Sequence, residues 1–545
     1  MSITIAYQEV TPNTENPAWS VVNGIFDEAS GVGLPMIQSS STLDANYNDY
    51  PYSIPLTLYA DFSNQPSFNG FSVGFSSEAY CPRIKVTFYS GSVGVSQTFN
   101  PSSSAYAYYQ RSLPTPYTGI KFEFLSASKP NATIVTEFFQ LGKVTMWSDA
   151  DLVDFPRITQ EVCPVGTDLP YDISEFTLYL PDGAPRLQRW DRITIKQNST
   201  FVARHYIDTA ERDGNNYHIK GMSIIGVLED MPYDGYFLDS GTISTANLLR
   251  STANNVDPAD AGSAAATGDT ARFIVDSSFD NDEYYNYPGA YRGNLPPGTR
   301  RSAIHRVVQC RGSLLRTLPN GTLNLLPCPS SASAGTNIPT SAIFQSGLNL
   351  QRKTPYSSLT HTFYSHTAEA ETTIWSGTLP AGTTHVTFSA PCYITSVTSG
   401  VTVTTARNAS YVWWADLTME NSQTVTILGM PLKAVETTVT QIFETGAGAV
   451  ANPLTISGND FILYDSPYGN VNAGALNAYY SSLRQNAELS CKIICSSIVP
   501  VMGARYNIVL SSGTMKGWLT KMTTTLSSNN RYAEITLTGI WEDAE

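Results

Sequence analysis

Two stretches of this 545-residue chain resemble each other and read as copies of one small β-unit. The first covers residues 190–221 and opens on Trp190-Asp191-Arg192, and the second covers residues 503–537 and opens on Gly503-Ala504-Arg505. Each holds a strand, a short turn, a second strand with an aromatic residue beside an aliphatic one, a polar turn with Asn-Asn, and a returning strand. A β-unit that is repeated within one chain predicts architecture rather than catalysis.

The composition predicts a mainly β protein of several domains. A chain of 545 residues is long enough for three or four domains, and its 42% of hydrophobic residues can fill their cores. Charged residues make up only 14%, against about a quarter in ordinary globular proteins. The 31 tyrosines, with abundant Ser, Thr, Asn and Gly, fit pleated sheets and their turns. A surface this poor in charge is typical of a protein covered by partner subunits, and also of Thr- and Ser-rich secreted proteins.

The charge argues against two classes of partner. The net charge is −14, from 32 basic and 46 acidic residues, and no run of Lys or Arg stands out. We therefore expect no nucleic-acid-binding surface, because phosphate contacts need clustered cations. We expect no membrane segment, since no stretch approaches about 18 apolar residues. The first residues also lack the basic and apolar regions of a signal peptide, so we expect synthesis and retention in a cytosol.

Seven cysteines are scattered along the chain, and their odd number favours free thiols over a disulfide framework. Two of them, four residues apart in an apolar run, would share one face of a strand, but no CxxC or His pair lies nearby to complete a metal site. We expect no metal and no cofactor. The cysteines are Cys81, Cys163, Cys310, Cys328, Cys392, Cys491 and Cys495.

Changes of pattern along the chain predict four regions. Residues 1–148 form an N-terminal arm and a β-sandwich, in which stretches such as 83–89 alternate apolar and polar residues. Residues 149–238 hold the first β-barrel unit, and residues 239–340 form a small α/β insert. Residues 341–545 hold the second β-barrel unit together with an accessory β-region.

Three helices and one hairpin interrupt the β pattern. Helices are predicted over residues 244–253, over a segment that Thr299 can cap, and over residues 472–485. The hairpin is predicted around Asn320-Gly321, because Asn-Gly is the strongest signal for a tight turn between strands.

The order of these elements resembles that of bacteriophage tail hub proteins, the family that includes baseplate hubs and tail-tip hubs. The residues that carry the resemblance are the run 295–301 (Leu-Pro-Pro-Gly-Thr-Arg-Arg) ahead of a helix, the triplet Asn452-Pro453-Leu454, and Pro500. In the family, a Gly-Asp follows that proline. Here Gly503-Ala504 lacks the acid, whereas Trp190-Asp191 keeps the acid and lacks the glycine. The resemblance spans roughly residues 155–545.

The resemblance implies a virion structural protein and no enzymatic activity. Three molecules, each with two tube-like barrels, would form a homotrimer that presents six barrels and adapts a sixfold tail tube to a threefold tip. The implied partners are distal tail and tail tube proteins, the tape measure protein, and receptor-binding or fibre proteins. The implied location is the phage tail tip, after assembly in the host cytoplasm.

The N-terminal sandwich resembles a galactose-binding-type jelly roll, a fold that many carbohydrate-binding modules share. Its tyrosine-rich loop, Tyr106, Tyr108 and Tyr109, has the chemistry to stack on a sugar of the host surface. The alternative is that these tyrosines pack against a loop or a partner chain, because a fold alone does not give a function.

Two other functions stay open from the sequence, a multi-domain carbohydrate-binding protein and a tail-associated glycan hydrolase. A hydrolase needs paired carboxylates. Asp280, Asp282 and Glu283 lie beside tyrosines, and with Asp276 they also offer a weak calcium pattern, but a solvated or interface loop explains them equally.

The histidines give no clear site either. His361 and His366 lie five residues apart in a β-like stretch and would face opposite sides, which argues against a zincin. His205 and His218 sit on the two strands of a hairpin and are interpreted as facing each other in a structural pair.

Overall fold

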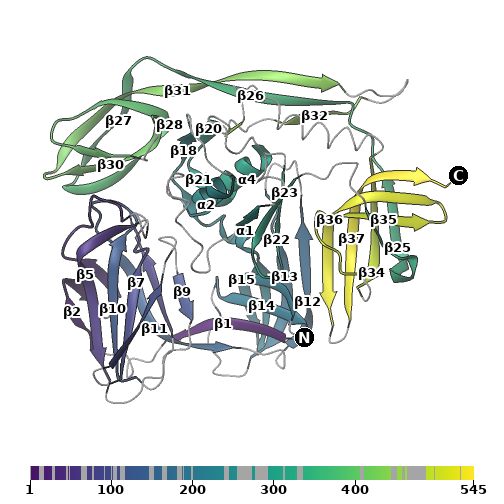
Figure 1. The fold of residues 1–545 in the computed structure, drawn as a ribbon, viewed down its shortest axis with the longest axis horizontal. Helices are drawn as coiled ribbons and strands as arrows, with labels where there is room; N and C mark the ends of the chain where they lie inside the picture. Colours follow the sequence, from purple (N-terminus) through teal and green to yellow (C-terminus); the bar gives the residue numbers. More distant parts are fainter. Residues whose placement is uncertain are drawn as a thin grey trace.

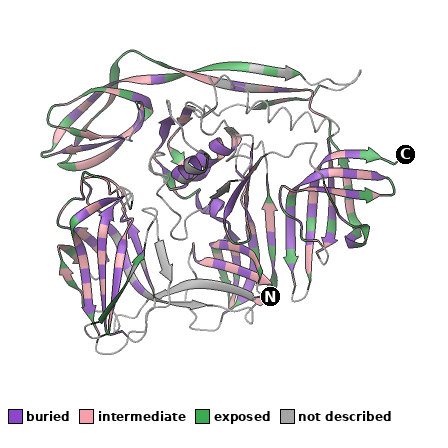
Figure 2. Cartoon of the chain, in the orientation of Figure 1, coloured by how far each residue is buried: buried purple, intermediate pink, exposed green. Residues whose placement is uncertain are grey.

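The fold is that of a computed structural model. It describes residues 2–10, 18–27, 31–44, 47, 49–62, 70–76, 79–90, 93–99, 101, 107–110, 117–146, 152–162, 169–180, 187, 189–197, 200–238, 245–254, 273–275, 292–310, 313–327, 335–405, 410–442, 451–456, 461–462, 486–495, 498–527 and 530–544. The chain is mainly β, as its composition predicted, and one large sheet runs from the N-terminal region into both repeated units (Figure 1). Buried residues concentrate between the sheets and in the helices of the insert (Figure 2).

The N-terminal region is a sandwich of two β-layers. One layer is a five-stranded sheet, and the other belongs to the large sheet. In the first layer the strands are β2 (Ser20–Val22), β5 (Tyr50–Asp61), β7 (Ile84–Ser90), β8 (Val93–Phe99) and β10 (Gly119–Ala127). In the second they are β3 (Gly24–Asp27), β4 (Val32–Pro35), β6 (Gly70–Phe75), β9 (Ala107–Gln110) and β11 (Thr136–Met146).

Aromatic side chains from both layers form the core of the sandwich. Phe122 of β10 lies edge-on to Phe71 of β6 and to Phe139 of β11, with ring centroids 5.0 and 4.9 Å apart. The alternation along β10 explains this placement, because Phe122 is fully buried while its neighbours Lys121 and Glu123 are only partly so.

The N-terminal strand β1 (Ser2–Val10) ties the sandwich to the first repeated unit. Residues 6–10 pair antiparallel with β11 of the sandwich, and residues 2–6 pair antiparallel with β14 (Arg192–Gln197). The predicted arm is therefore a strand that bridges two regions by backbone hydrogen bonds.

Each repeated unit contains five antiparallel strands in the same spatial order. The first unit has the order β12 (Leu152–Glu161), β13 (Ile173–Tyr179), β16 (Asn216–Met222), β15 (Thr200–Asp213) and β14. The second has the order β25 (Ile343–Arg352), β34 (Asn486–Ile494), β37 (Arg531–Asp543), β36 (Gly513–Leu526) and β35 (Arg505–Leu510).

The α/β insert follows the first unit, and its predicted elements are confirmed. α2 (Thr245–Asn254) and α4 (Arg300–Cys310) are the first two predicted helices, and the Asn320-Gly321 turn joins β22 (Ser313–Thr317) to β23 (Leu323–Pro327). The Thr299 hydroxyl accepts a hydrogen bond from the Ser302 backbone amide at 3.1 Å, which is the predicted cap. The predicted helix over residues 472–485 lies outside the described residues.

Short elements lie within the insert or in the segments next to it and in the later part of the chain. They are α1 (Ile224–Val227), β17 (Pro232–Tyr233), β18 (Tyr236–Leu238), β19 (Phe273–Val275), β20 (Arg292–Leu295), β21 (Gly298–Thr299), β24 (Thr336–Asn337), the 3-10 helix η4 (Thr340–Ala342) and β33 (Phe461–Ile462).

The accessory β-region is a seven-stranded sheet inserted between the first two strands of the second unit, β25 and β34. Two of its strands, β26 and β31, extend as an arm across the top of the molecule in Figure 1. The strands are β26 (Ser358–Ala368), β27 (Thr372–Leu379), β28 (Gly382–Val397), β29 (Thr402–Thr404), β30 (Val412–Met419), β31 (Gln423–Ile442) and β32 (Pro453–Ile456).

The same backbone feature precedes the third strand, in chain order, of each repeated unit. Trp190 and Gly503 have left-handed φ values of 73° and 74° just before β14 and β35. Each amide then donates to a carbonyl of the neighbouring strand, Trp190 to Ile207 at 2.7 Å and Gly503 to Leu519 at 2.9 Å. The alignment of Trp190-Asp191-Arg192 with Gly503-Ala504-Arg505, made from the sequence, therefore matches the backbone residue by residue.

The left-handed conformation at Gly503 predicts a graded response to substitution. Gly503→Ala should destabilise the fold by about 1–2 kcal/mol, because an L side chain is strained at this φ. Gly503→Asn should cost less, since Asn tolerates this region, and the nearest atoms to an added Cβ are 3.5 Å away. Urea unfolding of both variants measures the order, and an equal loss for the two would contradict a backbone origin.

Candidate assembly interface

The two units correspond strand by strand. In each unit, one residue from every strand lies in a row of cross-strand pairs, and matching the two rows shows which residues correspond. Both rows end on the arginine that follows the left-handed residue. The first row is Thr159, Ile173, Met222, Tyr206 and Arg192. The second row is Gln351, Glu488, Thr538, Trp518 and Arg505.

A β-bulge falls at the same place in both units. In the first unit the pairing of β15 with β16 shifts between Ile207 and Thr209. In the second the pairing of β36 with β37 shifts between Leu519 and Lys521. Counting from the matched rows, Ile207 corresponds to Leu519 and Thr209 to Lys521. A bulge adds one residue and bends a strand, so the two units share a bend as well as an order.

One strand joins the two units into a single sheet. β12, the first strand of the first unit, pairs antiparallel with the second half of β36 in the second unit, from Arg157↔Thr525 to Glu161↔Lys521. In Figure 1, β12 stands between the strands of the first unit and those of the second. We name the pairing of residues 157–161 with residues 521–525 the internal junction.

Apolar packing accompanies the hydrogen bonds of the internal junction. Ile158 of β12 is 2% exposed and shares a core cluster with Leu526 at the end of β36, which is fully buried. Met522 of β36 is buried in the core of the second unit, and the remaining side chains of the junction are polar. The Thr159 and Thr523 hydroxyls lie 3.2 Å apart, and Glu161 pairs with Lys521 at 3.5 Å on the exposed side.

A buried carboxyl holds the end of the junction strand. Gln160 donates from Nε2 to Asp172 Oδ2 at 2.8 Å, and the Asp172 amide donates to the Ser223 hydroxyl at 3.2 Å. Burial raises the pKa of Asp172 to about 7, although the hydrogen bond from Gln160 opposes the shift. The carboxyl is therefore protonated in the folded chain well above its ordinary range.

Two arginines hold α4 in place, Arg301 against the first unit and Arg300 against α2 within the insert. Arg301 donates from Nε to the Leu169 carbonyl at 2.8 Å, and Arg300 donates from Nη1 to the Ala253 carbonyl at 3.0 Å. Both arginines belong to the run 295–301 that carried the family resemblance, and both are buried. In this chain the run acts as a structural clamp.

A polar cluster connects the sandwich with the accessory sheet. Lys129, on the connection from β10 to β11, lies 3.8 Å from Asp416 of β30 and 5.2 Å from the centre of the Trp414 ring. His385 of β28 completes the cluster, with Nδ1 2.8 Å from Asp416 Oδ1.

Two of the three tyrosines that were predicted to contact a glycan lie among the described residues. Tyr108 and Tyr109 lie on β9, where their backbones pair with Ser72 and Phe71 of β6. Tyr106 lies outside the described residues. The glycan contact stays a prediction.

The predicted pairing of His205 with His218 is wrong. Glu211 lies opposite His218, because the tight turn at Gly214-Asn215 fixes the hairpin register. His205 instead lies in the core, with Nδ1 2.9 Å from the Ser174 hydroxyl, and burial lowers its pKa to about 3. It is therefore a neutral structural residue.

The other candidate sites hold no described cluster. Within the described ranges, no three His, Cys, Asp or Glu side chains gather as metal ligands, and no helix is long and apolar enough to cross a membrane. The acidic loop with Asp276, Asp280, Asp282 and Glu283 lies outside these ranges. His366 packs edge-on against Phe237, with ring centroids 5.1 Å apart.

The described cysteines are free thiols, as the odd number predicted. Cys81, Cys392 and Cys491 are buried, and Cys495 is partly exposed. Burial raises the pKa of Cys491 to about 12, so this thiol stays protonated.

No family model matches the sequence, and no curated protein matches it either. Among solved structures, the chain is similar to the 43 kDa tail protein of prophage MuSo2 from Shewanella oneidensis, with 10% identity, a TM-score of 0.38, and coverage of 73% of this chain and 95% of that one. It is also similar to a tail protein from Neisseria meningitidis, with 11% identity, a TM-score of 0.40, and the same coverages. A prophage tail protein from Listeria monocytogenes is similar as well, with 9% identity, a TM-score of 0.40, and coverage of 72% of this chain and 91% of that one. All three are tail proteins.

The internal junction predicts a core-type sensitivity at one position of β12. Ile158→Ala should destabilise the protein by about 2–5 kcal/mol, because it leaves a cavity between the units. It should also speed amide exchange over residues 521–525. The control Glu161→Ala removes only an exposed ion pair, worth about 1 kcal/mol or less. Exchange that is equally fast in both variants would contradict a shared core.

The buried carboxyl of Asp172 predicts that replacing it with a neutral side chain stabilises the fold, by an amount that depends on pH. Because its pKa is raised to about 7 in the folded chain, Asp172 costs stability progressively as the pH rises from about 4 to about 7. Asp172→Asn removes that cost and keeps an acceptor for Gln160. The stabilisation by Asp172→Asn should be larger at pH 8.5 than at pH 5.5 by about 2 kcal/mol, measured by urea unfolding. A gain that is equal at both pH values would contradict the raised pKa.

Proposed function

We propose that this protein is a virion structural component, the hub at the distal end of a phage tail. Three molecules form a ring in which six related β-units match a sixfold tail tube, while the accessory regions follow threefold symmetry. The hub joins distal tail and tail tube proteins and the tape measure protein on one side and mounts receptor-binding or fibre proteins on the other.

The observation that carries this proposal is the internal junction between two copies of one unit. A closed ring needs a heterologous contact that repeats by rotation, with one surface of a unit meeting a different surface of the next. Within a single chain, β12 of the first unit and β36 of the second make such a contact, since they are the first and fourth strands in the order of their units. The two units of one chain would thus occupy two neighbouring positions of the ring.

The same proposal assigns roles to the regions of the chain. Residues 1–148 form a jelly roll whose Tyr106, Tyr108 and Tyr109 contact either a host glycan or a neighbouring tail protein. Residues 149–238 and 341–545 carry the two ring units, the latter with the accessory region, and residues 239–340 form the insert that supports the first unit.

The purified chain is expected to form a threefold ring. Light scattering at high protein concentration should give three times the 59.3 kDa of one chain, and class averages from electron microscopy should show threefold symmetry with six similar densities in the ring. A stable monomer at high concentration, or a dimer, would count against the hub. The variant Glu371→Ala, on the exposed connection from β26 to β27 in the accessory region, serves as a control and should assemble normally.

A further inference from the structure

The strand order leaves two sheet edges without a described strand beside them. β25 pairs only with β34 within the described residues. The first half of β15 pairs with β14, but over residues 209–213 the described strands provide only β16 as a partner. We name these the β25 edge and the β15 edge.

The two edges are the counterparts of the strands in the internal junction. β25 corresponds to β12, because both are first in the order of their units. Residues 209–213 of β15 correspond to residues 521–525 of β36, by the matched rows and the matched bulge. The chain therefore fills one such contact within itself and carries the two halves of a second one at its ends.

The side chains of the internal junction are more buried than the matching side chains of the β25 edge and the β15 edge. In the internal junction Ile158, Met522 and Thr524 are buried. On the open edges the matching side chains face solvent to a larger extent. The exposed residues of the β15 edge are Thr209, Glu211, Arg212 and Asp213, and those of the β25 edge and its continuation are Asn349, Gln351, Arg352 and Lys353.

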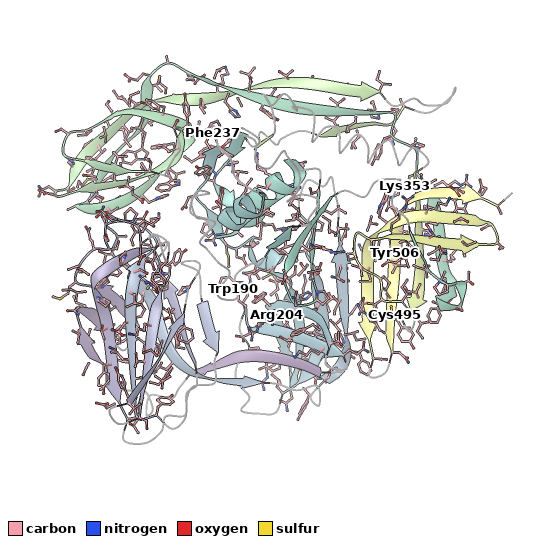
Figure 3. All side chains as sticks on the ribbon, viewed as in Figure 1. Trp190, Arg204, Phe237, Lys353, Cys495 and Tyr506 are labelled. Atoms are coloured by element: carbon pink, nitrogen blue, oxygen red, sulfur yellow. The ribbon has the colours of Figure 1, made fainter. Side chains whose placement is uncertain are left out.

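Applying the strand register of the internal junction to the two open edges predicts which residues would lie opposite each other. Thr159 lies opposite Thr523 in the internal junction, and the correspondence maps them to Gln351 and Glu211. An amide can donate to a carboxylate at that position. Lys353, which is ion-paired with Glu488 of its own chain and is labelled in Figure 3, then lies diagonal to Glu211 on the same face, within reach of a long side chain.

We propose that the β25 edge of one molecule pairs antiparallel with the β15 edge of a second copy of this chain, with Gln351 opposite Glu211. This inference rests on the proposed ring and specifies its contact between molecules. Edge strands left open template further pairing. A contact that repeats the internal junction three times closes the ring and leaves neither edge open.

A disulfide between molecules tests the register. Gln351→Cys and Glu211→Cys are combined in a Cys495→Ser background, since Cys495 is the partly exposed thiol. Thr159→Cys with Thr523→Cys is the positive control, because those hydroxyls are 3.2 Å apart within one chain. Gln351→Cys with Thr209→Cys is the control for a shifted register, and each single variant controls for other thiols.

After mild oxidation, the matched pair should give covalent dimers and trimers on a non-reducing gel and no larger species, because three links close the ring. Its yield should exceed that of the shifted pair by at least about tenfold, since diagonal positions are too far apart for a disulfide. Peptide mass spectrometry should recover the linked 351 and 211 peptides.

The outcomes separate this inference from the proposed function. Threefold particles without the matched crosslink, or with equal crosslinking of the shifted pair, would overturn the edge pairing and leave the hub standing. The absence of threefold particles at high protein concentration would overturn the hub, and the edge pairing with it. A ladder extending beyond trimers would replace the closed ring with an open filament.

Discussion

The architecture depends on β12, because this strand is hydrogen-bonded along both edges. On one side it begins the first unit through β13, and on the other it continues into the second unit through β36. Backbone hydrogen bonds in a sheet fix both distance and rotation, so two separately folded units become a rigid pair. Ile158 extends this coupling from the backbone to the core, and Asp172 holds the end of the strand through Gln160.

Local features were predictable because their causes are local. The Asn320-Gly321 hairpin and the Thr299 cap follow from turn and cap chemistry, and both are observed. The repeat could be found because strands and turns recur in one order. The left-handed residue before the third strand could be predicted only in the second unit. Glycine, as at Gly503, is the expected residue at a left-handed φ, and Trp190 is not.

Long-range features were not predictable for a physical reason. The internal junction pairs residues that are more than 300 positions apart, and no local pattern records which strands meet. The accessory sheet was merged with the second unit because period-2 alternation looks the same in both. The error over His205 had an available remedy, since a two-residue turn at Gly214-Asn215 sets the register and places Glu211 opposite His218.

The contact of His205 with Ser174 has a consequence for how the chain avoids folding incorrectly. At the matching positions the second unit has Gly517 and the fully buried Leu489. The first unit instead has its small residue at Gly221, where an added Cβ would lie 2.6 Å from the Ser174 hydroxyl. A strand exchanged between the units would set Leu489 against Gly221 and His205, where there is no room for it. Divergence of the two interiors thus penalises mispairing between halves that share one topology, so each strand finds its own partner.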